Sequence, residues 1–192
     1  FSTGAPSYTA TGSTGDGYRF AESVGHRILP PSPSLIPMEA AEKWPGTLAG
    51  LTLKNVALRE VQRGRLCYDE LGEMLFTHTG VSGPLVLSGS RHCDGDKDIK
   101  LEIDLKPGLS LEKLNARLQR DFDQYAKRQY ANALQDLLPG RLIQVVVELS
   151  GIAPDLKAAE INRRQRMALA ELLKALPITV TGFRPIEEAI VT

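Results

Sequence analysis

The stretch that decides the fold reads LTLKNVALREV over residues 51–61 and GRLCYDELGEMLFTHTG over residues 64–80. In its first part, Leu51 and Leu53 alternate with polar residues, and Val56 and Leu58 resume the alternation after a phase slip at Asn55. The alternation predicts a half-buried strand, and the slip predicts a β-bulge. The second part predicts two short strands joined by a turn at residues 70–72.

Another strand is expected downstream, where DIKLEIDL (residues 98–105) alternates cleanly after the polar turn HCDGDKD (residues 92–98). Upstream, the segment ILPPSPSLIPME (residues 28–39) holds four prolines, so it is expected to be extended or looped. Several short strands this close together predict a small antiparallel β-barrel or sandwich.

From Ser110 onwards the apolar spacing changes to that of helices. Ser110 is placed to cap a helix with an apolar stripe, and ANALQDLLPG (residues 131–140) predicts a second helix that Pro139 and Gly140 stop. RLIQVVVELSG (residues 141–151) is ambiguous between strand and helix; we favour a buried helix because its neighbours are helical. A long helix is expected over residues 155–176, ended by Pro177. The stripe after Ser110 consists of Leu111, Leu114, Leu118, Phe122 and Tyr125.

The chain ends in two further strand signals, ITVTGF (residues 178–183) and EEAIVT (residues 187–192). Strands followed by helices predict an α+β fold, with a β-rich subdomain and then an α-helical subdomain. We expect residues 31–108 to form the β-rich part and residues 109–177 the helical part, with residues 178–192 returning to the β-rich part. The first residue is Phe1, and both ends read as interior sequence, so we expect a piece of a longer protein.

Composition excludes several classes. Lys plus Arg and Asp plus Glu are 23 each, and this balance argues against a dedicated nucleic-acid binder. Cys67 and Cys93 lack metal-ligand spacing and form no disulfide framework, so no metal is expected and a reducing cytoplasm fits. No apolar run approaches the ~20 residues of a membrane span, so no membrane partner is expected.

A glycine-rich turn, TGSTGDG (residues 11–17), runs into a predicted helix over residues 14–25. Asp16 is expected to be the N-cap and Gly25 the left-handed stop. Such a turn suits a phosphate, but the motif is neither a P-loop nor a dinucleotide fingerprint, and no lysine follows it. From the residues alone, a structural cap and a ligand contact both stay open.

Four motifs in order carry a resemblance: SYTATGSTGDGY (7–18), PSLIPM (33–38), GEMLFTHTGVSGP (72–84) and EEAIVT (187–192). The chain resembles the bacterial NAD(P)/FAD-dependent oxidoreductases of the aminoacetone-oxidase-like flavoprotein family, and more distantly the fumarate reductase and succinate dehydrogenase flavoproteins. Thr9 stands where that family usually has proline. The family's Rossmann-like FAD domain has two glycine-rich segments that these 192 residues do not contain. The resemblance implies that the chain is an insert in that domain, with residues 1–30 as its flank.

The resemblance also implies site residues. Ser13, Thr14 and Asp16 would contact FAD in the intact protein, and Asp16 could cap the helix as well. His78 lies in a glycine-flanked loop that would face the cleft between insert and flavin domain, where it could donate a proton to the substrate. A lone histidine is more often structural or merely exposed, so both interpretations stay open.

Two functions are compatible with the residues. In the first, the chain is the substrate-cleft insert of a cytoplasmic FAD-dependent oxidoreductase that uses NAD(P)H and acts on a small molecule, such as an amine or an unsaturated steroid-like compound. By itself the insert would be inactive and bind no cofactor. In the second, it is a self-standing β-barrel and helix module that binds a protein or an RNA.

Overall fold

The computed structural model describes residues 7, 12 and 14–191 of the chain. Six strands close into an antiparallel barrel in the order β1-β4-β3-β2-β5-β6. The α+β prediction is therefore confirmed, and of the two alternatives left open the β-rich part is a barrel rather than a sandwich. The strands are β1 (Met38–Ala40), β2 (Thr52–Gln62), β3 (Arg65–Phe76), β4 (Gly80–Ser82), β5 (Ile99–Asp104) and β6 (Leu176–Phe183).

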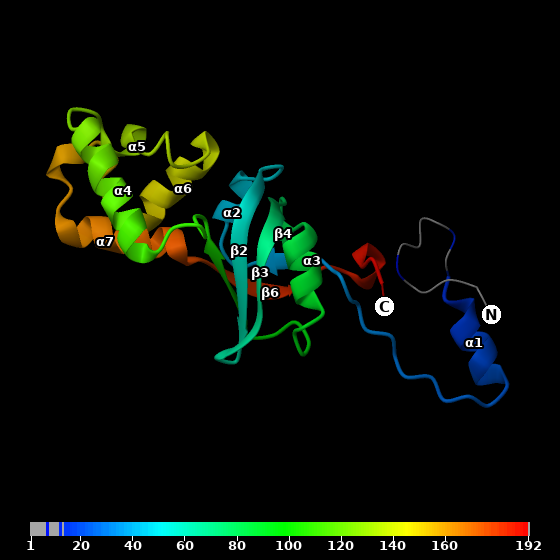
Figure 1. Ribbon diagram of the computed structural model, residues 1–192. Coiled ribbons are helices and arrows are strands. Elements are labelled where there is room, and N and C mark those ends of the chain that lie inside the picture. Colours follow the sequence, from blue (N-terminus) through cyan, green and yellow to red (C-terminus); the bar gives the residue numbers. More distant parts are fainter. Residues whose placement is uncertain (1–6, 8–11, 13, 192) are drawn as a thin grey trace.

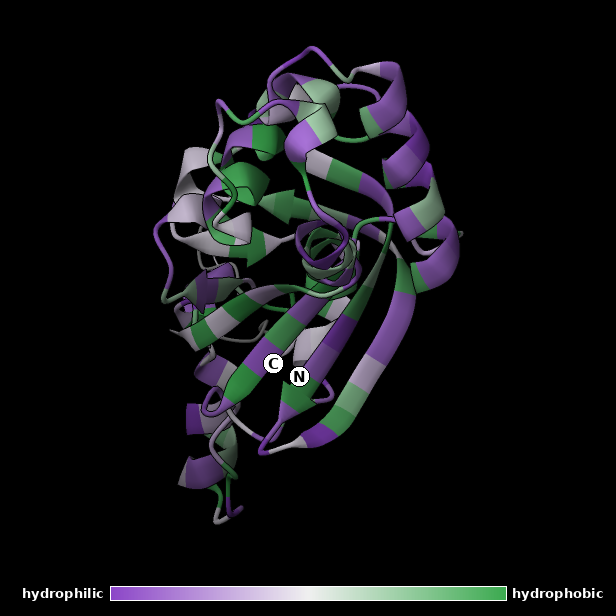
Figure 2. Cartoon of the chain, turned by 90° about the vertical axis from the view of Figure 1, so that its left-hand side faces the viewer, coloured by the Kyte–Doolittle hydropathy of each residue, from purple (hydrophilic) through white to green (hydrophobic). Residues whose placement is uncertain are grey.

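Strand β2 forms because its apolar residues alternate, and the expected bulge is present. Val56 and Leu58 are buried in the barrel, while Lys54 and Arg59 face solvent. Asn55 has a φ of 54°, and the pairing of β2 with β3 shifts between Leu53 and Val56. The alternation of hydrophobic and hydrophilic residues along the long strands is visible in Figure 2. Strand β5 was also predicted correctly.

The expected turn at residues 70–72 does not exist. Strand β3 is one strand of 12 residues, and Glu70 and Gly72 pair with Leu58 and Val56 of β2 in the middle of the ladder. The local polar and glycine signal is overridden because the 11-residue β2 offers a continuous partner along its length.

The helices between β5 and β6 lie at one end of the barrel (Figure 1). They are α4 (Leu111–Gln124), α5 (Tyr130–Ala133), α6 (Gly140–Ser150), the 3₁₀ turn η2 (Ala158–Glu160) and α7 (Arg163–Lys174). Ser110 caps α4 as predicted, its hydroxyl accepting a 3.3 Å bond from the Lys113 amide. The choice of helix for α6 is confirmed. The expectation of one full helix over residues 131–140 is wrong. Helix α5 has a single turn, and residues 134–137 form a separate turn.

Two other expectations near the C-terminal end are wrong. No continuous helix covers residues 155–176: α7 starts after a reciprocal capping box between Asn162 and Gln165, and Leu176 already belongs to β6. Pro177 lies inside β6, opposite Glu102 of β5, where β1 does not pair with the strand. The final segment forms the 3₁₀ turn η3 (Ile186–Glu188) and one isolated bridge from Val191 to Ser34 instead of a strand.

The barrel and the helices share one continuous hydrophobic core. Two short helices pack against strands of the barrel: α2 (Trp44–Thr47) against β4, and α3 (Pro84–Ser90) against β3 and β4. Both ends of the chain leave the barrel on the side away from α4–α7 (Figure 1). They are held together there, because Ser34 and Val191 exchange backbone hydrogen bonds of 2.8 and 3.3 Å.

Candidate functional site

The glycine-rich turn leads into α1 (Asp16–Ser23), a helix without buried residues. The predicted N-cap is wrong: Asp16 is the first helical residue, and Gly15, with a φ of 70°, precedes it without a side-chain cap. The Asp16 carboxylate forms an ion pair with Arg19 one turn later. Gly15 takes the left-handed conformation at low cost and occupies the N-cap position itself, so the helix begins one residue earlier than a capping Asp16 would require.

The predicted stop of α1 is confirmed. Gly25 has a φ of 88°, its amide donates to Glu22, and the His26 amide donates to Ala21, which together form a Schellman motif. Of the three expected FAD contacts, Thr14 is exposed and Asp16 partly exposed, while Ser13 lies outside the described residues.

His78 is exposed in the loop between β3 and β4. Within the described part of the chain, its side chain has no hydrogen-bond or ion-pair partner. The loop is fixed to α2, because a Cβ added at Gly46 would come within 2.7 Å of the His78 carbonyl oxygen. His78 lines an open cavity of about 540 Å³ together with Glu39, Glu42 and Lys43.

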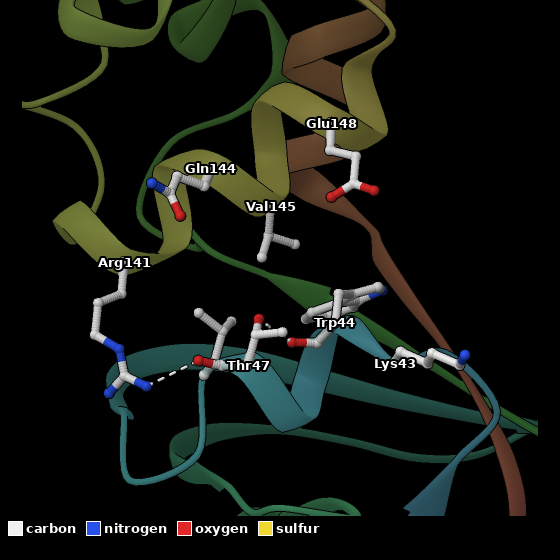
Figure 3. A pocket seen from close by; sticks show the side chains of 8 residues that line it. Lys43, Trp44, Thr47, Arg141, Gln144, Val145 and Glu148 are labelled. Atoms are coloured by element: carbon white, nitrogen blue, oxygen red, sulfur yellow. Dashed lines mark hydrogen bonds between the residues drawn. The ribbon is translucent and has the colours of Figure 1, made fainter.

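Two more cavities adjoin this one. Lys43 and Thr47 also line a cavity of about 340 Å³ between α2 and α6, which Figure 3 shows from close by. Gln144 and Glu148 of α6 connect it to a third cavity of about 710 Å³ that extends to residues 151–154. Together the three cavities form a trough from the His78 loop across α2 to the C-terminal end of α6. We call it the α2–α6 trough.

The floor of the α2–α6 trough carries the indole of Trp44. This ring is half-buried and packs edge-on against Phe76, with centroids 5.7 Å apart and an interplanar angle of 62°. Across from it, Gln144, Val145 and Glu148 of α6 point toward α2 (Figure 3).

The charged groups of the trough are unequally neutralised. Arg141 donates from Nη2 to two neutral carbonyl oxygens, Thr47 at 2.9 Å and Ala49 at 3.1 Å. Among the described residues neither Arg141 nor Lys43 has a carboxylate partner. The Glu42 carboxylate accepts from the Thr179 amide at 3.0 and 3.1 Å.

The other two acids of the trough differ from each other. Glu39 is paired with Arg184 at 2.7 Å. Glu148 has no cation partner in the described part of the chain. Among the described residues, two cations, Lys43 and Arg141, and two acids, Glu42 and Glu148, are thus left without an opposite charge, so the trough has no positive excess.

A second group of reactive side chains lies inside the barrel. Glu60 is completely buried, and its Oε1 atom has no hydrogen-bond partner among the described residues. The Cys93 thiol donates to Glu60 Oε2 at 3.4 Å, and the Cys67 thiol donates to the Glu60 carbonyl oxygen at 3.3 Å. Burial raises the pKa of Glu60 to about 7. Burial and the neighbouring Glu60 also raise the pKa of the Cys93 thiol, so the thiol stays protonated at neutral pH.

Neither the side chains around Glu60 nor the α2–α6 trough was predicted from the sequence. The signal for Glu60 was present, because Glu60 continues the inward phase of Val56 and Leu58 in β2. The trough had no local signal, because Trp44, His78 and Arg141 come from three separate segments that only the fold brings together.

Two further expectations concern metals and membranes. In the described residues no three His, Cys, Asp or Glu side chains are grouped as metal ligands would be. Likewise, none of the described helices has both the length and the apolar character needed to cross a bilayer.

Comparison with protein families gives one match over most of the chain. A family model described as the HI0933-like protein barrel and H2TH domain matches residues 32–191. The barrel and the helices described above fall within this range, whereas α1 lies before it.

Similar proteins carry enzyme names. A ribosomal RNA dihydrouridine synthase of Haemophilus influenzae is 32% identical over 193 residues, which is 99% of this chain and 45% of that protein. A ribosomal RNA dihydrouridine synthase of Escherichia coli is 29% identical, with 96% and 45% covered. A 3-dehydro-bile acid delta(4,6)-reductase of Clostridium scindens is 26% identical, with 92% and 44% covered. The chain thus spans slightly less than half the length of these relatives.

Proposed function

The chain belongs to the HI0933-like barrel and H2TH domain family, and from this premise we propose that it is part of a flavin-dependent oxidoreductase that reduces uridine in ribosomal RNA. The observation that carries the proposal is the similarity to two ribosomal RNA dihydrouridine synthases along 99% and 96% of the chain. We propose a cytoplasmic location, because ribosomal RNA is found there.

The names of the dihydrouridine synthases and of the bile-acid reductase imply the same class of chemistry. Conversion of uridine to dihydrouridine adds a hydride and a proton across one carbon–carbon double bond. A bile-acid reductase named for two double bonds performs an addition of the same class. The α1 flank and the motifs that resemble FAD-dependent oxidoreductases support a flavin as the hydride source, with NAD(P)H to reduce it.

The site residues proposed at the start of α1 could contact only part of a flavin cofactor. The exposed Thr14 hydroxyl and the partly exposed Asp16 carboxylate could accept hydrogen bonds from ribityl or ribose hydroxyls. The three cavities described above are lined by residues from Glu39 onward, so none of them adjoins α1. We propose that Ser13, Thr14 and Asp16 supply one edge of the flavin site, and that parts of the protein outside this chain supply the rest.

The proposed domain organisation follows from the path of the chain. Residues 1–30 would belong to the flavin domain, residues 31–108 to the barrel and residues 109–177 to the helices, and residues 178–192 would return through the barrel. The bonds between Ser34 and Val191 support this organisation, because an inserted domain needs its two ends close together.

In the reaction, a bound flavin would supply the hydride. The residue of this chain that we propose as proton donor is His78, because it is exposed, lies in a cavity and has no partner among the described residues. The surrounding trough would orient the substrate.

The proposal is tested by deleting the natural full-length gene and measuring dihydrouridine in ribosomal RNA by nucleoside mass spectrometry. We expect dihydrouridine at one or more positions to disappear and to return with the full-length gene. Unchanged dihydrouridine would contradict the proposed substrate.

A second candidate is reduction of a conjugated steroid, which the bile-acid relative favours. Turnover of a steroid enone by the purified full-length protein, with ribosomal RNA unchanged, would select it. A full-length protein that carries no flavin would instead favour the alternative of a self-standing module that binds an RNA or a protein.

A further inference from the structure

The two cysteines of the chain meet at the buried acid of the barrel. Cys67 belongs to β3, and Cys93 belongs to the loop of residues 91–98 between α3 and β5. The Cys67 thiol donates to the Glu60 carbonyl oxygen at 3.3 Å, and the Cys93 thiol donates to Glu60 Oε2 at 3.4 Å. Burial and Glu60 are the main causes of the raised pKa of Cys93, and a hydrogen bond with the Cys67 side chain is a further one. The two sulfur atoms are therefore neighbours.

The fold fixes both cysteines beside the same end of β2. The pairing of β2 with β3 shifts next to Glu60, which leaves Cys67 as an extra residue without a partner in the ladder. The Gln62 side chain holds the loop of Cys93, because its amide nitrogen donates to three carbonyl oxygens of that loop at 2.9 to 3.5 Å. Its oxygen accepts from the Asp94 amide at 2.8 Å. The approach of the two thiols is thus built into the barrel.

A small oxidant can reach this pair of thiols. Both cysteines are free and only partly buried. Cys93 lines a cavity of about 410 Å³, which is far larger than a molecule such as hydrogen peroxide. The same cavity is lined by Ser34, which bonds to Val191 where both ends of the chain leave the barrel.

The acid supplies a proton acceptor for thiol chemistry. Glu60 Oε2 already accepts from the Cys93 thiol, while Oε1 is buried and has no hydrogen-bond partner in the described part of the chain. Because burial raises the pKa of Glu60 to about 7, its charged and neutral forms coexist near neutral pH. Besides Cys93, the ionisable groups that face this acid among the described residues are Cys67 and Tyr68 of β3. Helix α3, which packs against the acid at Gly89, carries no ionisable side chain.

We propose that Cys67 and Cys93 are an oxidation site that forms a reversible disulfide when the protein meets a peroxide. Hydrogen peroxide oxidises the Cys67 thiol to a sulfenic acid and is itself reduced to one water. The Cys93 sulfur then attacks the Cys67 sulfur, so that the S–S bond forms and the S–O bond breaks. Glu60 accepts the proton of the Cys93 thiol and passes it to the departing hydroxide, which leaves as a second water. A small thiol such as glutathione reduces the bond again.

The order of the two steps follows from the surroundings of Cys93. The thiolate is the form that attacks a peroxide, and the raised pKa of Cys93 disfavours its thiolate until Glu60 takes the proton. Cys67 therefore reacts first and Cys93 second. This site goes beyond the proposed function, because it is the same for an RNA or a steroid substrate.

The primary test treats the full-length protein with hydrogen peroxide at a pH above that of Glu60 ionisation, alkylates the remaining thiols and maps the peptides by mass spectrometry. We expect the peptides of Cys67 and Cys93 as one joined pair, which dithiothreitol separates. Dimedone, which traps sulfenic acids, serves as a competitor. The ratio of joined to trapped Cys67 should be ~10-fold higher in the folded protein than in urea, because only the fold holds the two sulfur atoms together. Separate alkylation of both cysteines after peroxide, or an equal ratio in urea, overturns the proposal.

A second test addresses the proton acceptor. Glu60→Gln keeps the shape of the side chain but cannot accept the Cys93 proton, so the second step should slow and dimedone-trapped Cys67 should increase ~5-fold or more. Glu70→Gln, at an exposed position of β3, is the matched control and should trap as little as the wild type. Equal trapping in Glu60→Gln and the wild type overturns the role of Glu60, and trapping at Cys93 instead of Cys67 overturns the order of the steps.

Discussion

At the scale of single residues, the least expected group is the carboxyl of Glu60. Natural barrels seldom enclose an unpaired acid, because removing a charge from water costs several kcal/mol. Below about pH 7 the chain avoids most of this cost because the acid is protonated, since burial raises the pKa of Glu60 to about 7. A buried acid of this kind makes the stability of the barrel depend on pH.

The first prediction concerns the sign of that dependence. The pKa of Glu60 is higher in the folded state than its ordinary value of 4.5, so the folded state binds the extra proton between these two values. Stability is fully present below the unfolded pKa and is lost as the pH rises through about 7. A shift of this size corresponds to about 3 kcal/mol between pH 4 and pH 8.

Urea unfolding of the wild type and Glu60→Gln across this range measures the effect. The difference in free energy of unfolding between the two proteins should change by about 3 kcal/mol, with the wild type losing stability at high pH. The control is Glu70→Gln at an exposed position of β3, which should leave the pH profile unchanged. Parallel pH profiles for Glu60→Gln and the wild type would show that Glu60 is not the titrating group.

The second prediction concerns Gly89 of α3, which packs directly against this acid. A Cβ at position 89 would overlap the carboxylate of the fully buried Glu60, so the Glu60 side chain would have to shift. Gly89→Ala should therefore destabilise the protein by about 2 kcal/mol in denaturant unfolding, despite its better helix propensity.

Glu60→Ala supplies the missing space, so the cost of Gly89→Ala in that background should fall by more than 1 kcal/mol. Gly108→Ala is the control, because nothing lies within 4 Å of a Cβ there. Additive effects of the two substitutions would contradict the packing described here.

At the scale of elements, the sequence predicted correctly those features that local interactions determine. The alternation of β2, the Asn55 bulge, the Ser110 cap and the Gly25 stop all depend on residues close in sequence. The wrong predictions have nonlocal or competing causes. Glu70 and Gly72 have the residue types of a turn, but they pair with β2 in the middle of a strand. Residues 155–176 have the apolar spacing of one helix, but α7 begins only after Asn162, and Leu176 pairs with β5 in the barrel. For the same reason the α2–α6 trough, built from three distant segments, was not predictable.

The third prediction tests the start of α7. The Asn162 side chain accepts from the Gln165 amide at 2.9 Å, and the Gln165 side chain accepts from the Asn162 amide at 3.0 Å. Asn162→Ala removes half of this capping box and should lower the free energy of unfolding by about 1 kcal/mol. Asn132→Ala in α5, an exposed position, is the control and should cost less than half as much. Equal losses would mean that the box does not determine where α7 begins.

At the scale of the whole molecule, the chain has one continuous core, whereas the proposed flavin contacts lie in a segment outside that core. The barrel and helices bury their apolar residues in one continuous cluster, whereas α1 has no buried residue and lies apart from the barrel (Figure 1). The part that resembles a flavin-binding flank is therefore the part that packs least against the rest of the chain.

The fourth prediction follows from this separation. The 192-residue chain should bind no FAD detectable by flavin fluorescence, because Thr14 and Asp16 provide hydrogen bonds from a single edge and no cavity described here adjoins them. The full-length protein should purify with flavin absorbance, and Asp16→Asn should lower its flavin content without changing its melting temperature by more than a few degrees. The control is Asp155→Asn, an exposed acid far from α1 in sequence. A yellow preparation of the 192 residues would contradict the proposed division of the flavin site between this chain and the rest of the protein.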